Sequence, residues 1–232
     1  MFSRLKKLLN RSERASVGNA YMEQANGHEF VDLGLSVLWA SMNVGANDIY
    51  EFGLTYKWGE TKPSACSREQ YKFDIRPEVD LKLPGVVYPL SKYVVYSSDS
   101  TTDYRNVLES CDDATYSNFG GSWRMPTSAE WEELFSCEWD LVTINEMIDA
   151  IRIIGKNKNE IYLPINHNGM SIARSYSENA SCYWSSCLNV HNSHEAWAAA
   201  ICDTGFEEVT INPKSSTPRT MYCFVRGVLD KH

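Results

Sequence analysis

The sequence contains no run of hydrophobic residues long enough to cross a membrane as a helix, which needs roughly 18 apolar residues in succession. Its first residues, MFSRLKKLLNRSERASVGN, begin with basic side chains but have neither a continuous apolar stretch nor a clear cleavage site. Such a start is unlike a secretory signal. We therefore expect no transmembrane helix, and a cytoplasmic location is favoured over secretion.

Motifs of several enzyme classes are also missing. The seven cysteines include no CxxC pair, which excludes a zinc ribbon or a thioredoxin-like site. There is no glycine-rich phosphate loop, no GxSxG and no Cys/His pair in a recognisable context. An odd number of cysteines fits small buried thiols in a reducing compartment. We expect no catalytic residues and no cofactor.

Positive charge is scarce outside the N-terminus. The net charge is −8, yet residues 1–14 hold five basic residues and one acidic residue, so the rest of the chain carries −12. A nucleic-acid partner is therefore not expected, because phosphate contacts need clustered Lys and Arg. Phe2, Leu5, Leu8 and Leu9 fall on one helical face. This spacing fits contact with an anionic membrane or a partner helix, but a short solvated helix is the favoured interpretation.

Hydrophobic residues make up 43% of the chain and aromatic residues 12%, which is typical of a globular protein. We expect a basic arm over residues 1–27 and one domain over residues 28–232. Val31, Leu33, Leu35 and Val37 alternate with polar residues and glycine, which predicts a half-buried strand. Residues 50–110 are rich in turn formers, which indicates packed functional or lid-like loops.

The stretch GGSWRMPTSAEWEEL predicts a turn followed by a capped helix. Thr127 and Glu130 have the spacing of a capping box, and Gly120-Gly121 supplies a turn ahead of them. Trp131 and Leu134 begin the apolar stripe of this helix. Its acidic residues therefore have a structural interpretation, since the N-terminal end of a helix dipole favours acids.

The second half of the chain predicts one more helix and then strands. The stretch TINEMIDAIRII, residues 143–154, has isoleucines at helical spacing, and a turn then leads into a strand at 161–163. Strands are further predicted in SCYWSSC, EAWAAAICD, FEEVTIN and TMYCFVRGV. Strands, helices and a final run of strands together indicate an α+β domain.

Five stretches occur in an order typical of one family: VDLGLSVLWASMNVGA, YKWGET, NFGGSWRMPTSAEWEEL, CYWSSC and YCFVRGV. Over residues 28–229 the chain resembles the Fibrobacter succinogenes major paralogous domain proteins, which are widespread in Bacteroidetes. The resemblance implies a C-type-lectin-like fold with two helices and a twisted antiparallel sheet carrying long loops. This subclass is shared with formylglycine-generating enzymes and with the variable proteins of diversity-generating retroelements. The motifs of calcium-dependent sugar-binding lectins are absent, and INPK at 211–214 is a poor substitute.

Several groups of residues have both a chemical and a structural interpretation. His191, His194 and Glu195 could bind zinc, but their spacing matches no familiar motif, so a polar loop between two strands is favoured. Asp112, Asp113 and Asn118 could bind calcium, and turn formation explains them as well.

Two arginines and two cysteines also have alternative interpretations. Arg124 and Arg226 are interpreted as partners of buried acids or carbonyls. Cys182 and Cys187 do not align with the copper-binding cysteine pair of formylglycine-generating enzymes. Because they lie five apart on a predicted strand, they would face opposite sides.

These features predict a non-enzymatic module that presents a loop-rich C-terminal face to a protein or a glycan. The expected contact residues are polar or aromatic: Asn189, His191, Asn192, His194, Trp197, Phe206, Asn212 and Tyr222. Trp197 fits a core position equally well. The resemblance adds the possibility that this face is the varied surface of a retroelement target. The alternatives are an oxidase similar to formylglycine-generating enzymes, with Cys182 and Cys187 as its thiols, and a structural subunit of a surface fibre or phage particle.

Overall fold

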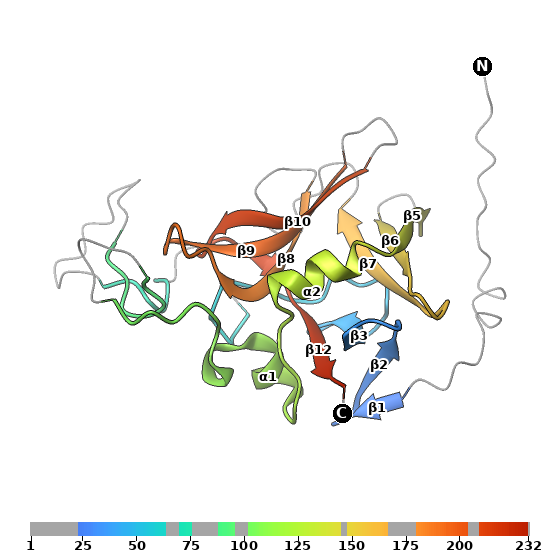
Figure 1. The fold of residues 1–232 in the computed structure, drawn as a ribbon, viewed down its shortest axis with the longest axis horizontal. Coiled ribbons are helices and arrows are strands. Elements are labelled where there is room, and N and C mark those ends of the chain that lie inside the picture. The colour runs from blue at the N-terminus through green and yellow to red at the C-terminus, as the bar shows by residue number, and fades with distance from the viewer. Residues whose placement is uncertain are drawn as a thin grey trace, which may run out of the picture.

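The computed structural model describes residues 23–63, 70–75, 88–95, 102–144, 148–166, 180–203 and 209–231. Over these residues the protein is mostly β-sheet (Figure 1). Two short helices, α1 (Ala114–Phe119) and α2 (Ser128–Leu134), and one 3-10 turn, η2 (Ser110–Asp112), accompany the strands. This content agrees with the predicted α+β class. Within the same residues, neither helix has the length and hydrophobicity needed to cross a bilayer.

The first sheet joins the two ends of the described chain. It has the order β1-β2-β3-β12, with β1 at Glu23–Ala25, β2 at His28–Asp32, β3 at Val37–Asn43 and β12 at Arg226–Asp230. Asn26 and Gly27, at the end of the predicted arm, form the turn between β1 and β2 with φ of 52° and 81°. Asn-Gly favours this hairpin turn because both positions need positive φ.

The continuous strand predicted over residues 31–37 is wrong. β2 ends at Asp32 and β3 begins at Val37, with a turn at residues 33–36 in which Gly34 has a φ of 71°. Leu33 and Leu35 are nevertheless buried, because the turn folds against Gly155 and Lys156, whose amide donates to the Leu33 carbonyl at 2.9 Å. The alternation of apolar residues therefore indicates burial correctly but not backbone conformation.

The second sheet forms the centre of the molecule. Its order is β10-β9-β8-β11-β4, with β4 at Thr55–Tyr56, β8 at Ala180–Leu188, β9 at Glu195–Asp203, β10 at Val209–Pro218 and β11 at Cys223–Phe224. β11 runs parallel to β8, and the other pairs are antiparallel. The strands predicted at SCYWSSC and EAWAAAICD are confirmed as β8 and β9. β10 contains residues 209–212 of the predicted strand FEEVTIN, whose first three residues lie outside the described ranges. The strand predicted in TMYCFVRGV is confirmed from Cys223 onward. This last strand divides at Val225 into β11 and β12, which belong to different sheets.

The third sheet has the order β5-β6-β7, with β5 at Glu138–Thr143, β6 at Ile148–Ile154 and β7 at Glu160–Asn166. The helix predicted over residues 143–154 is therefore wrong, whereas the strand at 161–163 is confirmed within β7. β6 is the middle strand and pairs with a neighbour on each side. Its β-branched isoleucines suit this position, since such side chains pack well on a pleated surface.

Two hydrophobic cores lie on opposite faces of the second sheet. Cys182 and Trp184 of β8 face the first core, which also contains Trp58 and Trp123. Tyr183, between them in sequence, faces the second core. Because successive residues of a strand point to opposite faces, β8 separates the two cores. Both faces of this sheet are covered, so its outer edges and connecting loops are the parts left to contact other molecules.

Helix α2 covers the second-core face of the sheet and begins as predicted. The Thr127 hydroxyl accepts from the Glu130 amide at 3.2 Å, and the Glu130 carboxylate accepts from the Thr127 amide at 2.7 Å. Gly120 and Gly121 have φ of 68° and 62°, which confirms the predicted turn ahead of the helix and shows that it uses positive φ. Trp131 is fully buried against Trp39, with ring centroids 4.9 Å apart. The capping box thus fixes where an aromatic anchor enters the second core.

Thr127→Ala tests this helix start. The substitution removes the side-chain acceptor for the Glu130 amide, and loss of such a cap lowers the free energy of unfolding by about 1 kcal/mol. Urea denaturation measures the change. Ser117→Ala, at an exposed position inside α1, is the matched control and is expected to be neutral. Equal stability of the two variants would show that the cap contributes nothing.

Candidate functional site

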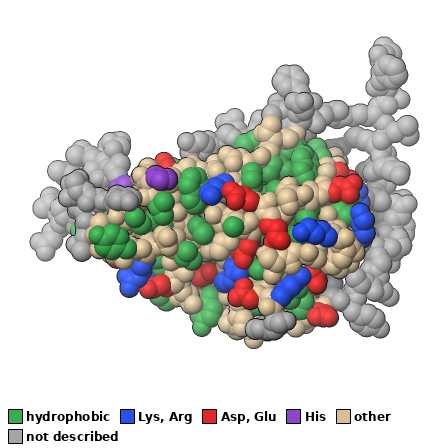
Figure 2. All heavy atoms as spheres, in the orientation of Figure 1, with side chains coloured by type: hydrophobic (Ala, Val, Ile, Leu, Met, Phe, Trp, Pro, Cys, Tyr) green, Lys and Arg blue, Asp and Glu red, His purple; other side chains and the backbone are tan. Residues whose placement is uncertain are grey.

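One end of the molecule is built from loops. It comprises segments 70–75, 88–95 and 102–108, the β8–β9 loop (189–194) and the β10–β11 turn (219–222), which we call the loop end. Figure 1 shows the β8–β9 loop beside the green and cyan segments at the left, far from the β5–β7 sheet. Histidine and hydrophobic side chains lie on the surface at this end in Figure 2. Residues distant in sequence therefore meet here, as expected of a binding surface.

The buried guanidinium of Arg219 holds these loops together. Its side chain is 1% exposed. Nε donates to the Tyr71 hydroxyl at 2.9 Å, and the two terminal nitrogens donate to the carbonyls of Lys92, Tyr93 and Ser193 at 3.2, 3.3 and 2.9 Å. One side chain thus contacts segment 70–75, segment 88–95 and the β8–β9 loop.

Aromatic rings surround the same guanidinium. Its central carbon lies 4.8 Å from the ring centroid of Trp58, 5.1 Å from Phe73, 5.4 Å from Tyr71 and 5.8 Å from Tyr93. The negative faces of such rings attract a cation, and the attraction is stronger where water is excluded. The rings therefore offset part of the cost of burying the charge of Arg219.

Two tyrosines at the loop end have left-handed backbone conformations, with φ of 60° at Tyr93 and 56° at Tyr104. Bulky residues rarely adopt positive φ, and such strain concentrates at functional sites. Asp103 maintains the conformation, because its carboxylate accepts from the Tyr93 and Val94 amides at 2.9 and 2.8 Å. Tyr104 is 73% exposed.

The β8–β9 loop is closed by polar side chains. The Asn189 amide donates to the Ser216 hydroxyl at 2.6 Å, and that hydroxyl donates to the Glu195 carboxylate. The Asn189 side-chain carbonyl accepts from the His191 amide at 3.1 Å, and Asn192 accepts from the His194 amide in the same way. These are the local turns that asparagine favours. The predicted polar loop between two strands is confirmed, and these hydrogen bonds account for its conformation.

The structure separates the predicted contact residues by role within this loop. His191 and Asn192 are exposed at its tip. His194 is half-buried, and burial lowers its pKa, with the charge of Arg219 acting in the same direction. Asn189 is buried, and its side chain is engaged in closing the loop. Only His191 and Asn192 of the four therefore present their side chains fully to solvent.

The remaining predicted contact residues lie further along the sheet. Trp197 is half-buried on β9, with the Lys214 ammonium 5.5 Å from its ring centroid. Asn212 is exposed on edge strand β10 opposite Ala200, which belongs to the first core, so it points away from Trp197. Tyr222 is half-buried beside the Lys57 ammonium at 5.6 Å. Phe206 lies outside the described residues. The seven described members of this set thus do not form one surface.

Residues that sequence patterns do not single out complete the loop end. Arg219 lies in a turn-forming stretch, and no local pattern indicates that its side chain is buried. Tyr104, Ile75 and Val107 are exposed large side chains on the long loops of the 50–110 region. The many turn-forming residues predict that residues 50–110 form loops, but they do not predict which side chains of these loops are exposed.

The acidic residues considered for calcium have structural partners. Asp112 is buried and bonded to the ammonium groups of Lys72 and Lys92 and to the Tyr93 hydroxyl. Asp113 caps α1, accepting from the Thr115 and Tyr116 amides, and also accepts from the Met125 amide. Asn118 donates to the Ala114 carbonyl at 2.7 Å. Ion pairs therefore account for Asp112, and helix formation accounts for Asp113 and Asn118.

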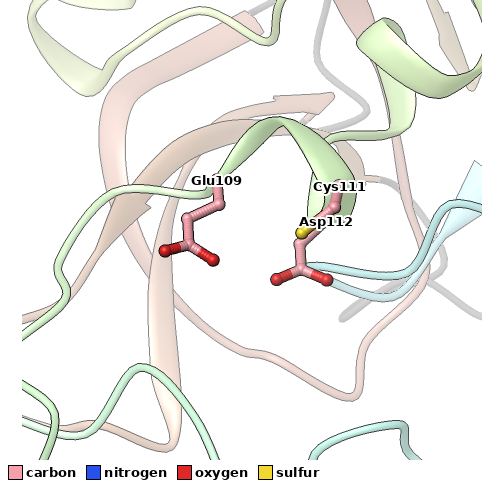
Figure 3. A group of neighbouring side chains, drawn as sticks. All are labelled: Glu109, Cys111 and Asp112. Atoms are coloured by element: carbon pink, nitrogen blue, oxygen red, sulfur yellow. The ribbon is translucent and has the colours of Figure 1, made fainter.

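Glu109, Cys111 and Asp112 lie together on the turn η2, with ligand atoms within 4.8 Å of one another (Figure 3). The Lys92 ammonium binds the carboxylates of both Glu109 and Asp112, and Arg105 binds Glu109 at 2.8 Å. Cations of the protein itself thus neutralise these acids. The arrangement works as an ion-pair network that joins segments 70–75, 88–95 and η2.

The two arginines considered as structural partners fulfil that prediction. Arg124 pairs with Glu130 and Asp230. The fully buried Arg226 donates to the Asn43 side chain at 2.8 Å and to the Ala40 and Tyr162 carbonyls at 2.9 and 2.7 Å. It therefore links β12 to β3 and β7.

The cysteines of the oxidase alternative have different surroundings. Cys182 is buried in the first core, whereas Cys187 is half-buried at an isolated bridge with Val107. The thiol that contacts Cys182 is Cys223.

The chain matches no family model, no curated protein and no solved structure.

Asp112→Asn is expected to remove part of the acid sensitivity of the protein. Burial raises the pKa of Asp112, but hydrogen bonds from Lys72, Lys92 and Tyr93 outweigh it and leave the pKa below its usual value. Stability from this carboxylate is therefore fully present above about pH 4 and is lost as the pH falls through the folded-state pKa.

Urea unfolding at pH 7 and pH 3 measures this effect. The variant is expected to be less stable than wild type by about 1.5–3 kcal/mol at pH 7, the usual contribution of hydrogen bonds to a charged group. The difference should shrink at pH 3. An unchanged difference between the two pH values would contradict the ion-pair role.

Arg219→Ala is expected to loosen the loop end. It leaves the carbonyls of Lys92, Tyr93 and Ser193 without their donor, and each unsatisfied buried group costs about 1–3 kcal/mol. Hydrogen exchange should accelerate at the Tyr93, Val94 and Val95 amides more than in β6 and β7. The control is Arg152→Ala, which breaks the half-exposed ion pair with Asp140 and should cost at most ~1 kcal/mol. Uniform acceleration along the chain would show that Arg219 has no special role at this end.

Proposed function

We propose that the protein is a non-enzymatic binding module that uses the loop end to contact a protein or a glycan. The observation that carries this proposal is the buried Arg219, which ties three loop segments to the central sheet. Binding side chains act best when rigid elements hold them in place, because little conformational freedom is then lost on association. The loops are thus preorganised although they contain little regular secondary structure.

The exposed side chains of the loop end suit recognition. Tyr104 supplies a large aromatic surface with a hydroxyl group, and aromatic side chains of this kind are frequent energetic anchors of interfaces. His191 and Asn192 add hydrogen-bond donors and acceptors. Ile75 adds an exposed apolar side chain. Aromatic side chains together with small polar side chains are the composition found in antibody binding sites.

We also propose the C-type-lectin-like fold that the family resemblance implies. Its support is the presence, in the described residues, of two helices and a twisted, largely antiparallel central sheet with long connections. In such a scaffold the variable surface of a retroelement target would include the C-terminal strands and loops, and here His191 and Asn192 lie between β8 and β9. A near-copy of the 3′ coding region beside a reverse-transcriptase gene supports that origin, and its absence removes it.

A binding screen tests the proposed function. The full chain is applied to an array of glycans and to a panel of purified cell-surface proteins, and each ligand is titrated against variants. Tyr104→Ala and His191→Ala are expected to weaken binding at least tenfold, equivalent to about 1.4 kcal/mol. Trp139→Ala, an exposed residue of β5 in the sheet far from the loop end, is the matched control and should bind as wild type.

Two results would contradict the proposal. One is a well-folded protein that binds nothing in either panel. The other is a ligand whose affinity responds to Trp139→Ala but to neither loop-end substitution.

A further inference from the structure

Two cysteines from distant parts of the sequence lie side by side in the central sheet. β11 and β8 are parallel, and Phe224 of β11 is the register partner of Tyr183 of β8. The residues that precede them, Cys223 and Cys182, are therefore lateral neighbours. Both side chains face the first core, where Cys182 is 5% and Cys223 is 2% exposed.

The two thiols contact each other. The side chains of Cys223 and Thr217 both lie within hydrogen-bonding reach of the Cys182 sulfur. The hydrogen bond from Cys223 lowers the pKa of Cys182, burial opposes this effect, and Thr217 adds to the lowering. Burial raises the pKa of Cys223, and its contact with Cys182 raises it further. Cys182 is thus the more acidic thiol and the better candidate for a thiolate nucleophile.

The backbone geometry suits a covalent bond between them. Neighbouring strands lie about 4.8 Å apart, and disulfides need Cα atoms within roughly 4.4–6.8 Å of each other. Cys202 of β9 also lies close to Cys182, but it is paired in register with Ala180, two residues away along β8. The lateral pair therefore has the more favourable placement.

We propose that Cys182 and Cys223 form a reversible disulfide when the protein meets a hydroperoxide. The Cys182 thiolate attacks one peroxide oxygen, the O–O bond breaks, and Cys182 becomes a sulfenic acid while hydroxide leaves. The Cys223 sulfur then attacks the Cys182 sulfur, and the S–OH bond breaks with loss of water. Two thiols and one hydrogen peroxide thus give one disulfide and two waters. A dithiol then reduces the disulfide back to two thiols by exchange and is itself oxidised to a disulfide.

The disulfide would link the segment that contains Arg219 covalently to β8. Cys223 lies four residues after Arg219 in the segment that leads out of the β10–β11 turn. Joining it to β8 closes a long loop between residues 182 and 223, which stabilises a protein chiefly by restricting the unfolded chain. The thermal unfolding midpoint of the oxidised form should therefore rise by about 5–10 °C.

Mass spectrometry of the native protein tests the proposal. The reduced full chain is treated with hydrogen peroxide without denaturant, alkylated, digested without reduction and mapped for linked peptides. The expected result is one linked pair that contains Cys182 and Cys223, with a loss of two hydrogens that dithiothreitol restores. Cys111→Ser, at an exposed cysteine, is the control and should leave this link intact.

The measurement on the wild-type protein tests the proposal by itself, so the test does not depend on whether a cysteine variant folds. The proposal fails if Cys182 and Cys223 both remain alkylatable after treatment while the exposed Cys111 is oxidised. It also fails if Cys182 links to Cys202 or Cys187 instead. Cys223→Ala gives a second test, because the sulfenic acid on Cys182 should then persist and react with dimedone.

Discussion

The buried charge of Arg219 is the constraint on which the loop end depends. A guanidinium taken out of water is costly unless all its donors find acceptors. Among the described residues its partners are three carbonyls and a tyrosine hydroxyl, and four aromatic rings surround it. These acceptors come from separate segments. All the donors of Arg219 are therefore satisfied only when these segments are packed together. Burial of Arg219 thus requires that the loops be ordered.

The short stretch from Arg219 to Arg226 links the whole molecule. Arg219 holds the loop end, Cys223 and Phe224 form the strand between β4 and β8, and Arg226 joins β12 to β3 and β7. Cys223, one member of the cysteine pair, lies between the two arginines on this stretch. Formation or reduction of the proposed disulfide between Cys223 of β11 and Cys182 of β8 would thus act next to the β10–β11 turn. These eight residues therefore connect the loop end directly to the central and first sheets.

Local signals explain what the sequence can predict. The capping box of α2 depends on Thr127 and Glu130 alone, and Gly120-Gly121 supplies its own turn, so both are predictable. Residues 143–154 predict a helix because isoleucines at helical spacing cannot be distinguished there from a central strand. Pairing with β5 and β7 makes this segment a strand, and the residues of the segment alone do not reveal that pairing. Composition identifies the exposed tip residues His191 and Asn192. It does not identify Arg219, because the partners of that side chain are up to 148 residues away.

The most direct test of this account is NMR spectroscopy of the Arg219 side chain in the intact protein. If the guanidinium is caged as described, its Nε–H proton exchanges slowly with water and is shifted upfield by the surrounding rings, although arginine side-chain protons normally exchange fast. A rapidly exchanging, unshifted signal would mean that Arg219 is solvated and does not tie the loops to the sheet, and the preorganisation ascribed to it would then not exist.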